Sequence, residues 1–257
     1  MIYILGGEGF IGSALVRACA RQGLIHRVIN RDNYSQLVGS SCSVLINANG
    51  NSKKYLAIQD PVTEFDASVR SVRSTLLDFN FDSYVYLSSC DIYPDCSSPA
   101  ATNEDRAIDV THQSPYGFHK FLAEQCVRHG AAQSLILRLG GCIGPGLRKG
   151  PIYDIMSDAP LWLDLDSELQ FMHTDDLASI ALTLVNRGLW GQLFNVCGQG
   201  TVRLRTVVEF IGRAVAVNPD SPRVRYDVNI NKLSGVISEV PGSEQAVLAF
   251  VSADGAR

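Results

Sequence analysis

Short hydrophobic runs alternate with amphipathic patterns along the first half of the chain. Apolar runs rich in β-forming residues predict buried strands over Ile2–Leu5, Arg27–Asn30, Ser43–Ala48, Tyr84–Ser88 and Leu135–Leu139. Apolar residues spaced three and four positions apart predict helices over Phe10–Gln22, Pro61–Phe79 and Pro115–Arg128. This alternation predicts an α/β fold in which a doubly wound parallel sheet is covered by helices on both faces.

The pattern is less regular after residue 145. It predicts strands over Leu161–Leu165 and Leu193–Val196, and helices over Asp175–Asn186 and Leu204–Ala216. The end of the chain, Ser252–Arg257, is expected to be frayed. We therefore expect residues 1–145 to form mainly the sheet core and residues 146–257 to form mainly a smaller region, interleaved with returning core elements.

Composition narrows the class of protein. The chain has 257 residues, 46% hydrophobic and 19% charged, which suffices for one large domain or a domain with a small appendage. The net charge of -4 and the lack of a long basic run argue against a nucleic-acid partner. No apolar run approaches the roughly 20 residues that span a bilayer, and no leader pattern is evident. The seven cysteines are scattered without a C-x-x-C pair, so we expect a cytoplasmic protein with no metal site and no membrane partner.

A glycine-rich turn follows the first predicted strand and opens the first predicted helix. Its sequence is Gly6-Gly7-Glu8-Gly9-Phe10-Ile11-Gly12. Gly6 permits a tight turn, Gly9 lets a pyrophosphate approach the backbone, and Gly12 allows the helix to pack closely on the strand. The helix N-terminus, with Phe10 and Ile11 in its first turn, would supply N–H groups and positive potential to the phosphates. The turn therefore predicts a dinucleotide-binding, Rossmann-like sheet.

A tyrosine and a lysine lie four residues apart at the start of a predicted helix. Ser114 suits the N-cap position and Pro115 the first helical position, so Tyr116 and Lys120 share one face. This spacing also occurs on ordinary helix surfaces. An ammonium group and a helix N-terminus both stabilise a phenolate, so we expect the pKa of Tyr116 to fall from about 10 toward neutrality. Tyr116 could then exchange a proton with a substrate hydroxyl or carbonyl.

A third motif, Leu87-Ser88-Ser89-Cys90-Asp91-Ile92-Tyr93-Pro94, places hydroxyl groups at the end of a strand. With the G-x-x-G-x-x-G turn and the Tyr-x-x-x-Lys pair, it resembles the extended short-chain dehydrogenase/reductase family of the NAD-dependent epimerase/dehydratase type. Further segments resemble that family in the same order, over roughly residues 1–215: Asn47-Ala48-Asn49, Asp60-Pro61, Arg138–Gly146, Phe171–Ala178 and Phe194–Val196.

The resemblance implies an oxidoreductase that moves a hydride between a nicotinamide and a substrate carbon. It implies Tyr116 as the acid/base, Ser89 as a hydrogen-bonding partner of the reacting oxygen, and Lys120 as a ligand of the nicotinamide ribose. The implied cofactor site also includes Gly6, Gly9, Phe10, Ile11, Gly12, Asn47, Ala48, Asn49 and Leu139. Structural roles are expected for His173, Asp175, Asp176 and Asn195, and a surface position for His119.

The chain departs from the family pattern in three places. Gly141 stands where many members that bind sugar nucleotides carry an Asn that contacts the substrate diphosphate. Only about a dozen residues separate the second strand from Ser43, where the usual member has a further helix and strand. The resemblance also implies that residues 146–257 are mainly a small substrate-binding region, and its substrate-side segment Leu147–Gln170 is short. The chain thus resembles a trimmed member, whose substrate pocket is open, completed by a second subunit of a homodimer, or built for a smaller molecule.

Two choices stay open at this stage. After the second strand, Asp32 would favour NAD by binding the ribose 2′-OH, whereas Arg31 would favour the 2′-phosphate of NADP. NAD is our first expectation. Beside Ser89, Cys90 and Asp91 occupy positions where relatives carry an extra acid/base that acts on the substrate. The structural alternative is that Cys90 packs in the core and Asp91 caps the following turn.

Three functions fit these residues. The first is epimerisation or reduction at a carbonyl or alcohol of a sugar or sugar nucleotide. The second is ketoreduction of a smaller substrate without a nucleotide, which Gly141 and the short Leu147–Gln170 segment favour. The third is a regulator that senses NAD or NADP without turnover, although such proteins often lose the Tyr or the Lys that this chain retains.

Overall fold

The computed structural model describes residues 1–51 and 53–254, which form two compact units. Unit 1 comprises Met1–Pro94, Arg106–Leu139 and Ala178–Phe194. Unit 2 comprises Asp95–Asp105, Gly140–Leu177 and the described residues from Asn195 onward. Each unit is described in turn because the chain crosses between them several times.

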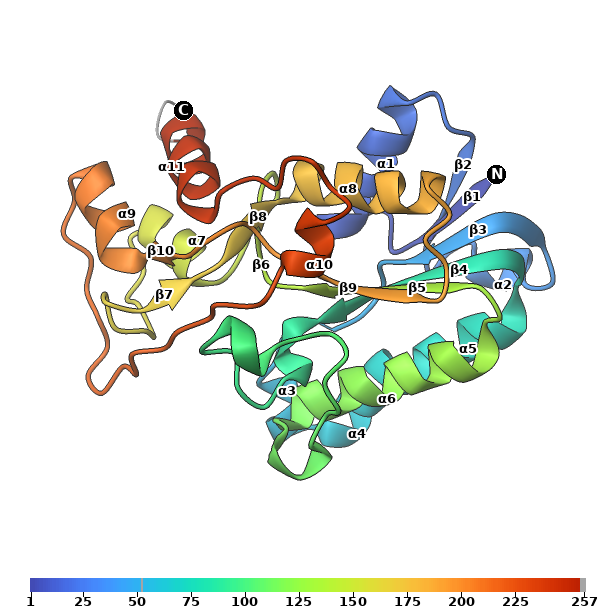
Figure 1. The fold of residues 1–257 in the computed structure, drawn as a ribbon, viewed down its shortest axis with the longest axis horizontal. Coiled ribbons are helices and arrows are strands. Elements are labelled where there is room, and N and C mark those ends of the chain that lie inside the picture. Colours follow the sequence, from blue (N-terminus) through green and yellow to red (C-terminus); the bar gives the residue numbers. More distant parts are fainter. Residues whose placement is uncertain (52, 255–257) are drawn as a thin grey trace. The chain divides into compact units, whose positions relative to one another are not determined.

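A six-stranded sheet forms the centre of unit 1 (Figure 1). The strand order is β2-β1-β3-β4-β5-β9, and the pairs from β2 through β5 are parallel. The strands are β1 (Ile2–Leu5), β2 (His26–Ile29), β3 (Ser41–Asn47), β4 (Asn80–Ser89), β5 (Ser134–Leu139) and β9 (Gln192–Val196). Because the chain leaves β1 toward β2 and then returns to β3 on the other side, the sheet is doubly wound. The predicted Rossmann-like fold class is confirmed.

Helices cover both faces of this sheet. Figure 1 shows α1 (Phe10–Arg21) on one face and α5 (Ser71–Asp78) with α6 (Pro115–Gly130) on the other. The α5–α6 face is closed by a continuous apolar cluster that includes Tyr84 and Tyr86 of β4. Shorter helices are α2 (Tyr34–Leu37), α3 (Leu56–Gln59) and α4 (Pro61–Phe65), and α8 (Thr174–Asn186) precedes β9. This packing fixes the ends of β1, β3 and β4, where the candidate site lies.

The helix predicted over Pro61–Phe79 is divided. A π-helical turn, Asp66–Arg70, separates α4 from α5. Asp60 caps the start of α4, since its side chain accepts a hydrogen bond of 3.1 Å from the Thr63 N–H. Residues within the wider π-helical turn are buried, among them Ser68. Turns of this kind interrupt the regular helical spacing and often occur near functional sites.

Unit 2 is built from short elements around its own core. Strand β6 (Gly141–Ile143) pairs in parallel with β8 (Phe171–His173), and β7 (Glu168–Leu169) pairs antiparallel with β10 (Val202–Arg203). The helices are α7 (Pro151–Met156), α9 (Leu204–Ile211), α10 (Asn231–Ser234) and α11 (Ser243–Asp254). An apolar cluster drawn from β6, α7, α9 and α11 joins these elements.

Three predictions for this half of the chain are wrong. The expected strand Leu161–Leu165 is reduced to one bridge between Leu161 and Val217, because the chain turns at Asp164, whose carbonyl accepts from the Ser167 N–H at 3.0 Å. The helix expected to reach Ala216 ends at Ile211, since Gly212 adopts a left-handed φ of 67°. At the C-terminus, residues 252–254 continue α11 rather than fraying, while residues 255–257 lie outside the described residues.

Two segments before residue 145 belong to unit 2: Asp95–Asp105 and the start of Gly140–Leu177. Hydrogen bonds explain the first of these. The Asn195 amide donates to the Thr102 carbonyl at 2.7 Å, and the Thr102 hydroxyl accepts from the Asn229 N–H at 2.8 Å. Asn195 thus has the structural role expected of it.

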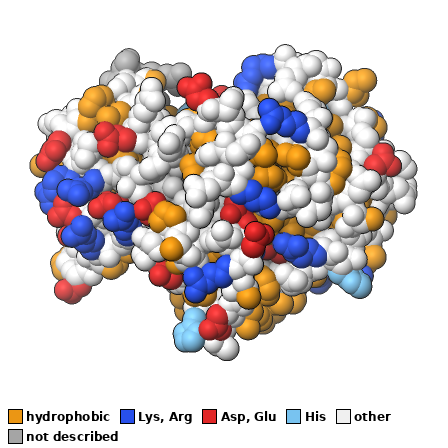
Figure 2. Space-filling view, viewed as in Figure 1, with side chains coloured by type: hydrophobic (Ala, Val, Ile, Leu, Met, Phe, Trp, Pro, Cys, Tyr) orange, Lys and Arg blue, Asp and Glu red, His pale blue; other side chains and the backbone are white. Residues whose placement is uncertain are grey.

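Charged side chains of both signs are interspersed on the visible face of the molecule (Figure 2). In unit 2, Arg203, Arg223 and Arg225 approach the Glu168 carboxylate with N–O distances of 3.6, 3.9 and 3.6 Å. The arginines are exposed, so water screens these pairs and each contributes little to stability. Among residues 1–51 and 53–254, no helix is long and apolar enough to cross a membrane.

Candidate functional site

The glycine-rich turn joins β1 to α1 in the way its sequence suggests. Gly6 has a φ of +72°, which a residue with a side chain rarely adopts. A Cβ at Gly12 would collide with the backbone of Gly6, so this glycine lets α1 lie against the turn. Gly9 is the N-cap of α1 and has no side chain to cap the helix. A Cβ there would have the Gly6 carbonyl oxygen, at 3.1 Å, as its single described neighbour within 4 Å, so the helix N-terminus faces open space.

A substitution at Gly9 should therefore damage ligand binding more than folding. We expect Gly9→Val to fold and to bind NAD at least tenfold more weakly, about 1.4 kcal/mol, because the side chain would occupy the space in front of the helix N-terminus. The matched variant Gly12→Ala should instead lose stability through its backbone collision. Calorimetric titration and thermal unfolding of both variants separate the effects. Unchanged NAD affinity in folded Gly9→Val would contradict the assignment of this turn.

The residues after β2 border the same turn. The Asn30 amide donates to the Glu8 carboxylate at 2.7 Å, and the Asn30 side-chain oxygen accepts from the Asp32 N–H at 3.1 Å. Arg31 and Asp32 are both exposed, so either can turn toward a ribose. The Glu8–Asn30 contact, which the sequence motifs did not reveal, fixes the distance between the end of β2 and the glycine-rich turn.

The segment Asn47-Ala48-Asn49 ends β3 beside Gly6. A Cβ at Gly6 would lie 3.1 Å from the backbone of Asn49, so the two turns are in contact. The Asn47 side chain is buried, donates to the Tyr84 hydroxyl at 2.7 Å and accepts from the Asn49 N–H at 3.0 Å. Asn47 therefore shapes the turn, which leaves its backbone, Ala48 and exposed Asn49 to face a ligand.

The start of α6 presents Tyr116 to the end of β4. The Ser114 hydroxyl accepts from the Gly117 N–H at 3.0 Å and caps the helix. A Cβ at Gly117 would collide with the Asp91 carbonyl oxygen, so glycine is needed for α6 to approach the 3-10 turn Cys90–Ile92. This close approach brings Tyr116 into hydrogen-bonding contact with Ser89. The Tyr116 hydroxyl also donates to the Asn51 carbonyl at 3.2 Å.

Asp91 and Lys54 continue this contact as a series of hydrogen bonds. The Ser89 hydroxyl donates to the Asp91 carboxylate at 2.9 Å, and the Asp91 N–H returns a bond of 3.2 Å to the Ser89 oxygen. Lys54 donates to the other Asp91 carboxylate oxygen at 2.7 Å. Ser89 caps the 3-10 turn Cys90–Ile92, the role that one alternative gave to Asp91, and the Asp91 carboxylate is the group that orients Ser89. The sequence motifs gave no sign of Lys54.

The Lys120 ammonium lies among buried hydrogen-bond acceptors. Its Nζ donates to the Leu87 carbonyl at 3.2 Å and to the Tyr86 hydroxyl at 3.3 Å. Burial lowers the pKa of Lys120 from its ordinary value of 10.5 to about 8, and the charges of Glu64, Glu124 and Asp91 oppose that change.

The pKa of Tyr116 moves in the direction opposite to the one expected. Burial raises it above its ordinary range, the charges of Asp91 and Glu64 add to the rise, and the hydrogen bond with Ser89 opposes it. The expectation failed because the Lys120 ammonium bonds to Tyr86 and Leu87, while Tyr116 lies close to carboxylates. In the protein by itself, Tyr116 thus carries its proton at neutral pH.

Two other residues of the predicted site lie at the carboxyl ends of β4 and β5. Cys90 is 1% exposed, and its thiol donates to the Arg138 carbonyl at 3.4 Å, which favours the packing role over a catalytic one. Leu139 is buried at the end of β5, where it pairs with Ser89 of β4. Leu139 therefore lies next to the hydroxyl-bearing end of β4.

The surface position expected for His119 is wrong. His119 is 8% exposed, and its Nδ1 bonds to the carboxylate of Glu64, which is 1% exposed. Helix α6 packs against α4 and the π-helical turn along this side, so the face that carries His119 is buried instead of solvated. The two residues are 55 positions apart in the chain, a separation that no local pattern could bridge.

Gly141 belongs to unit 2, where close packing explains its identity. A Cβ at this position would lie 2.7 Å from the Gln170 carbonyl oxygen and 2.7 Å from the Phe171 ring, so β6 can pair with β8 here only without a side chain. His173 accepts a bond of 3.2 Å from the Asp175 N–H, which agrees with a structural role.

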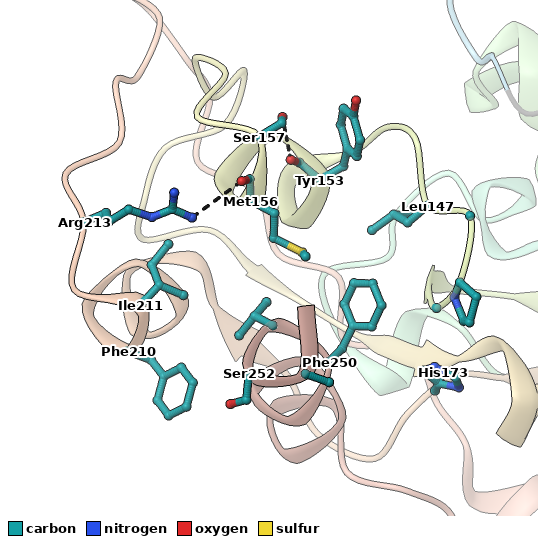
Figure 3. A pocket seen from close by; sticks show the side chains of 15 residues that line it. Leu147, Tyr153, Met156, Ser157, His173, Phe210, Ile211, Arg213, Phe250 and Ser252 are labelled. Atoms are coloured by element: carbon teal, nitrogen blue, oxygen red, sulfur yellow. Dashed lines mark hydrogen bonds between the residues drawn. The ribbon is translucent and has the colours of Figure 1, made fainter. Parts of the chain in front are cut away.

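Unit 2 also contains a cavity of about 920 Å³. Figure 3 shows Leu147, Met156, Phe210 and Phe250 around it, with the Arg213 guanidinium donating to the Met156 carbonyl at 3.5 Å. The described residues that line it supply no carboxylate and no thiol. The paired hydroxyl, carboxylate and ammonium groups suited to proton transfer lie instead in unit 1, at the ends of β3 and β4.

Comparison with models of known families shows which family the chain belongs to. The model of the NAD dependent epimerase/dehydratase family matches residues 2–197. The chain belongs to this family. It is therefore an NAD-dependent enzyme, and the glycine-rich turn, with its uncapped helix N-terminus, fits the cofactor's phosphates. No curated protein sequence matches the chain.

Solved structures agree with the fold of this epimerase/dehydratase family member. MoeE5 in complex with UDP-glucose and NAD is 16% identical, with a TM-score of 0.84 over 99% of this chain and 98% of that one. A UDP-galactose 4-epimerase is 22% identical, with a TM-score of 0.79 over 99% and 98% of the two chains. The UDP-glucuronic acid 4-epimerase of Bacillus cereus, with UDP-glucuronic acid and NAD, is 16% identical, with a TM-score of 0.76 over 98% and 99%.

Proposed function

We propose that this enzyme uses NAD to move a hydride at an alcohol or carbonyl carbon of a sugar or sugar nucleotide, with Tyr116 as the proton-transfer residue. The observation that carries the proposal is the placement of Tyr116, Ser89 and Asp91 in one hydrogen-bonded group above the buried Lys120. Several solved structures with the same fold carry UDP-sugars together with NAD, which supports the substrate class.

The residues of the group divide the work between proton transfer and orientation. Ser89 donates its proton to Asp91 and accepts from the Asp91 N–H, so one lone pair of its oxygen is left to accept a bond from a substrate hydroxyl. Tyr116 then exchanges a proton with the same substrate oxygen as the adjacent carbon gains or loses a hydride. Lys54 holds the Asp91 carboxylate in place with a contact of 2.7 Å, which keeps the Ser89 hydroxyl turned in one direction.

NAD, when bound, supplies the hydride acceptor and a positively charged ring. A positive charge close to Tyr116 would offset the burial and the carboxylates that hold its proton in place. Lys120 lies beside Gly50, whose Cβ, if present, would be 3.5 Å from the ammonium. We assign Lys120 to the cofactor ribose on this basis.

One observation favours the alternative of a smaller substrate without a nucleotide. At Gly141 no side chain fits between β6 and β8, so the Asn contact to a diphosphate cannot be restored at this position. A ketone or alcohol recognised through its reacting carbon would still use Tyr116 and Ser89 in the same way. A regulator without turnover has no comparable observation in its support.

Mass spectrometry under native conditions, followed by turnover assays, tests the proposal. We expect NAD to bind to the purified protein and UDP-glucose or UDP-galactose to be interconverted, oxidised or reduced, as followed by nicotinamide absorbance and by chromatography of the sugar. Turnover of small ketones alone would establish the second candidate. If NAD binds and neither substrate class reacts, the proposed catalysis is wrong.

A further inference from the structure

A carboxylate of the glycine-rich turn lies at the end of β2. The Gly6 N–H donates to the Ile29 carbonyl at 3.0 Å, which joins the turn to the last residue of that strand. Asn30 follows directly, and its side-chain amide donates to Oε1 of Glu8 at 2.7 Å. Glu8 is exposed, so its carboxylate is accessible to a cofactor bound at the turn.

The place where this carboxylate lies bears on cofactor choice. In Rossmann-like sheets, an acidic side chain at the end of the second strand accepts a hydrogen bond from the ribose 2′-OH of NAD. Here the first residue after that strand is Asn30, which is neutral. Its contact with Glu8 brings a carboxylate to the same place from the glycine-rich turn instead. Sequence spacing alone gives this task to Asp32.

The donor that holds Glu8 is itself fixed. The Asn30 N–H donates to the Asn33 side chain at 2.9 Å, and the Asn30 side-chain oxygen accepts from the N–H groups of Asp32 and Asn33 at 3.1 and 3.2 Å. The Asn33 amide donates in turn to the Val28 carbonyl at 3.0 Å. The Glu8 carboxylate is therefore held against an ordered turn.

The two other charged side chains after β2 are not held in this way. Arg31 and Asp32 are exposed, and no hydrogen bond or ion pair within residues 1–51 and 53–254 fixes either side chain. A group that is already in place loses less conformational freedom when a ligand binds. Oxygen Oε2 of Glu8 has no partner among the described residues, so it can accept a bond from a ribose hydroxyl.

We propose that Glu8, held by Asn30, selects NAD over NADP. Its carboxylate accepts a hydrogen bond from the 2′-OH of the adenosine ribose, whereas the 2′-phosphate of NADP would bring like charges together, and such repulsion is a common source of specificity. The inference rests on the cofactor part of the proposed function. It depends neither on the substrate nor on proton transfer by Tyr116.

Calorimetric titration with NAD and with NADP, in the absence of substrate, tests the proposal. The unsubstituted protein should bind NAD at least about tenfold more tightly than NADP. Glu8→Gln keeps the length of the side chain and an acceptor oxygen but removes the charge. We expect it to reduce the ratio of the two dissociation constants at least about fivefold, chiefly through tighter binding of NADP.

Added salt gives a second measurement, which a purely structural role of Glu8 would not affect. Salt screens repulsion between exposed charges, so the preference for NAD should weaken as the salt concentration rises. The change should be larger in the unsubstituted protein than in Glu8→Gln. An equal response of the two proteins to salt would contradict electrostatic selection by Glu8.

Asp32→Asn and Asp82→Asn are the matched controls, since each removes one exposed negative charge. Asp32→Asn should change the ratio less than Glu8→Gln does, because its side chain is not held. Asp82 lies near the amino end of β4, whereas the glycine-rich turn follows the carboxyl end of the parallel β1, so Asp82→Asn should leave the ratio unchanged.

Three results would overturn the proposal: an unsubstituted protein that binds NADP as tightly as NAD, an unchanged ratio in Glu8→Gln, or a larger change in Asp32→Asn than in Glu8→Gln. If neither dinucleotide binds, this proposal and the cofactor site fail together. All of these measurements concern binding alone, so an error in the proposed reaction or its substrate would leave the results unchanged.

Discussion

Replacing Tyr116 with Phe is expected to lower turnover by about two to four orders of magnitude, the usual loss when a general acid/base is removed. The ring keeps its place, since Tyr116 is 7% exposed and packs at the start of α6. Its hydroxyl bonds to the Asn51 carbonyl at 3.2 Å, and losing one such bond should change stability by about 1 kcal/mol. NAD affinity, measured by calorimetric titration, should survive.

Two further variants sharpen this test. Ser89→Ala removes the hydroxyl that links Asp91 to Tyr116, so its turnover should fall between those of the unsubstituted enzyme and Tyr116→Phe. Tyr3→Phe makes the same chemical change at a buried tyrosine of β1, outside the candidate site, and should leave turnover unchanged. Near-full activity in Tyr116→Phe would move the acid/base role to Asp91 or end the proposed reaction.

Local motifs carried most of the information about unit 1. The glycine-rich turn, the N-cap Ser114 and the Tyr116–Lys120 spacing each depend on residues a few positions apart, so the sequence could place them on their elements. Even the glycine at 117, which had no assigned reason, is explained by one close approach to the Asp91 carbonyl. Family likeness then supplied the roles that spacing alone could not.

The parts that sequence could not predict depend on contacts between distant residues. Lys54 meets Asp91 across 37 positions and His119 meets Glu64 across 55, and both pairs alter the charge around Tyr116 and Lys120. The pKa of Tyr116 was misjudged for this reason, since the helix and its lysine were visible in the sequence and the carboxylates were not. In unit 2, Gly212 was a stop signal that could have been recognised, because glycine commonly ends helices.

Replacing Lys120 with Met is expected to affect function and stability in opposite directions. The ammonium is assigned to the cofactor ribose, so both NAD affinity and turnover should fall strongly. Stability should respond differently, because Lys120 is 5% exposed and burial lowers its pKa from 10.5 to about 8. A buried ammonium opposes folding, and methionine of similar length removes that opposition.

The lowered pKa of Lys120 determines the direction in which stability changes with pH. The unfolded chain, with the ordinary lysine pKa, binds the proton more tightly than the folded protein, so folding becomes more favourable as pH rises from about 8 to about 10.5. Below about pH 8, the buried ammonium makes its full unfavourable contribution to folding. The difference of 10.5 − 8 = 2.5 units corresponds to about 3 kcal/mol. Relative to Lys120→Met, the unsubstituted protein should gain roughly this free energy of unfolding between pH 7 and pH 10.5.

Urea denaturation of both proteins at several pH values measures that difference, and groups other than Lys120 cancel in the comparison. The exposed Lys53 offers the control, because Lys53→Met removes a positive charge from the surface of the protein. Its difference from the unsubstituted protein should not change across the same pH range. If the difference in free energy of unfolding between Lys120→Met and the unsubstituted protein also stays constant with pH, burial of the Lys120 ammonium does not oppose folding as its lowered pKa implies. A steep difference together with lost NAD binding would show that the site retains a destabilising charge for the sake of its chemistry, the pattern expected where stability is given up for activity.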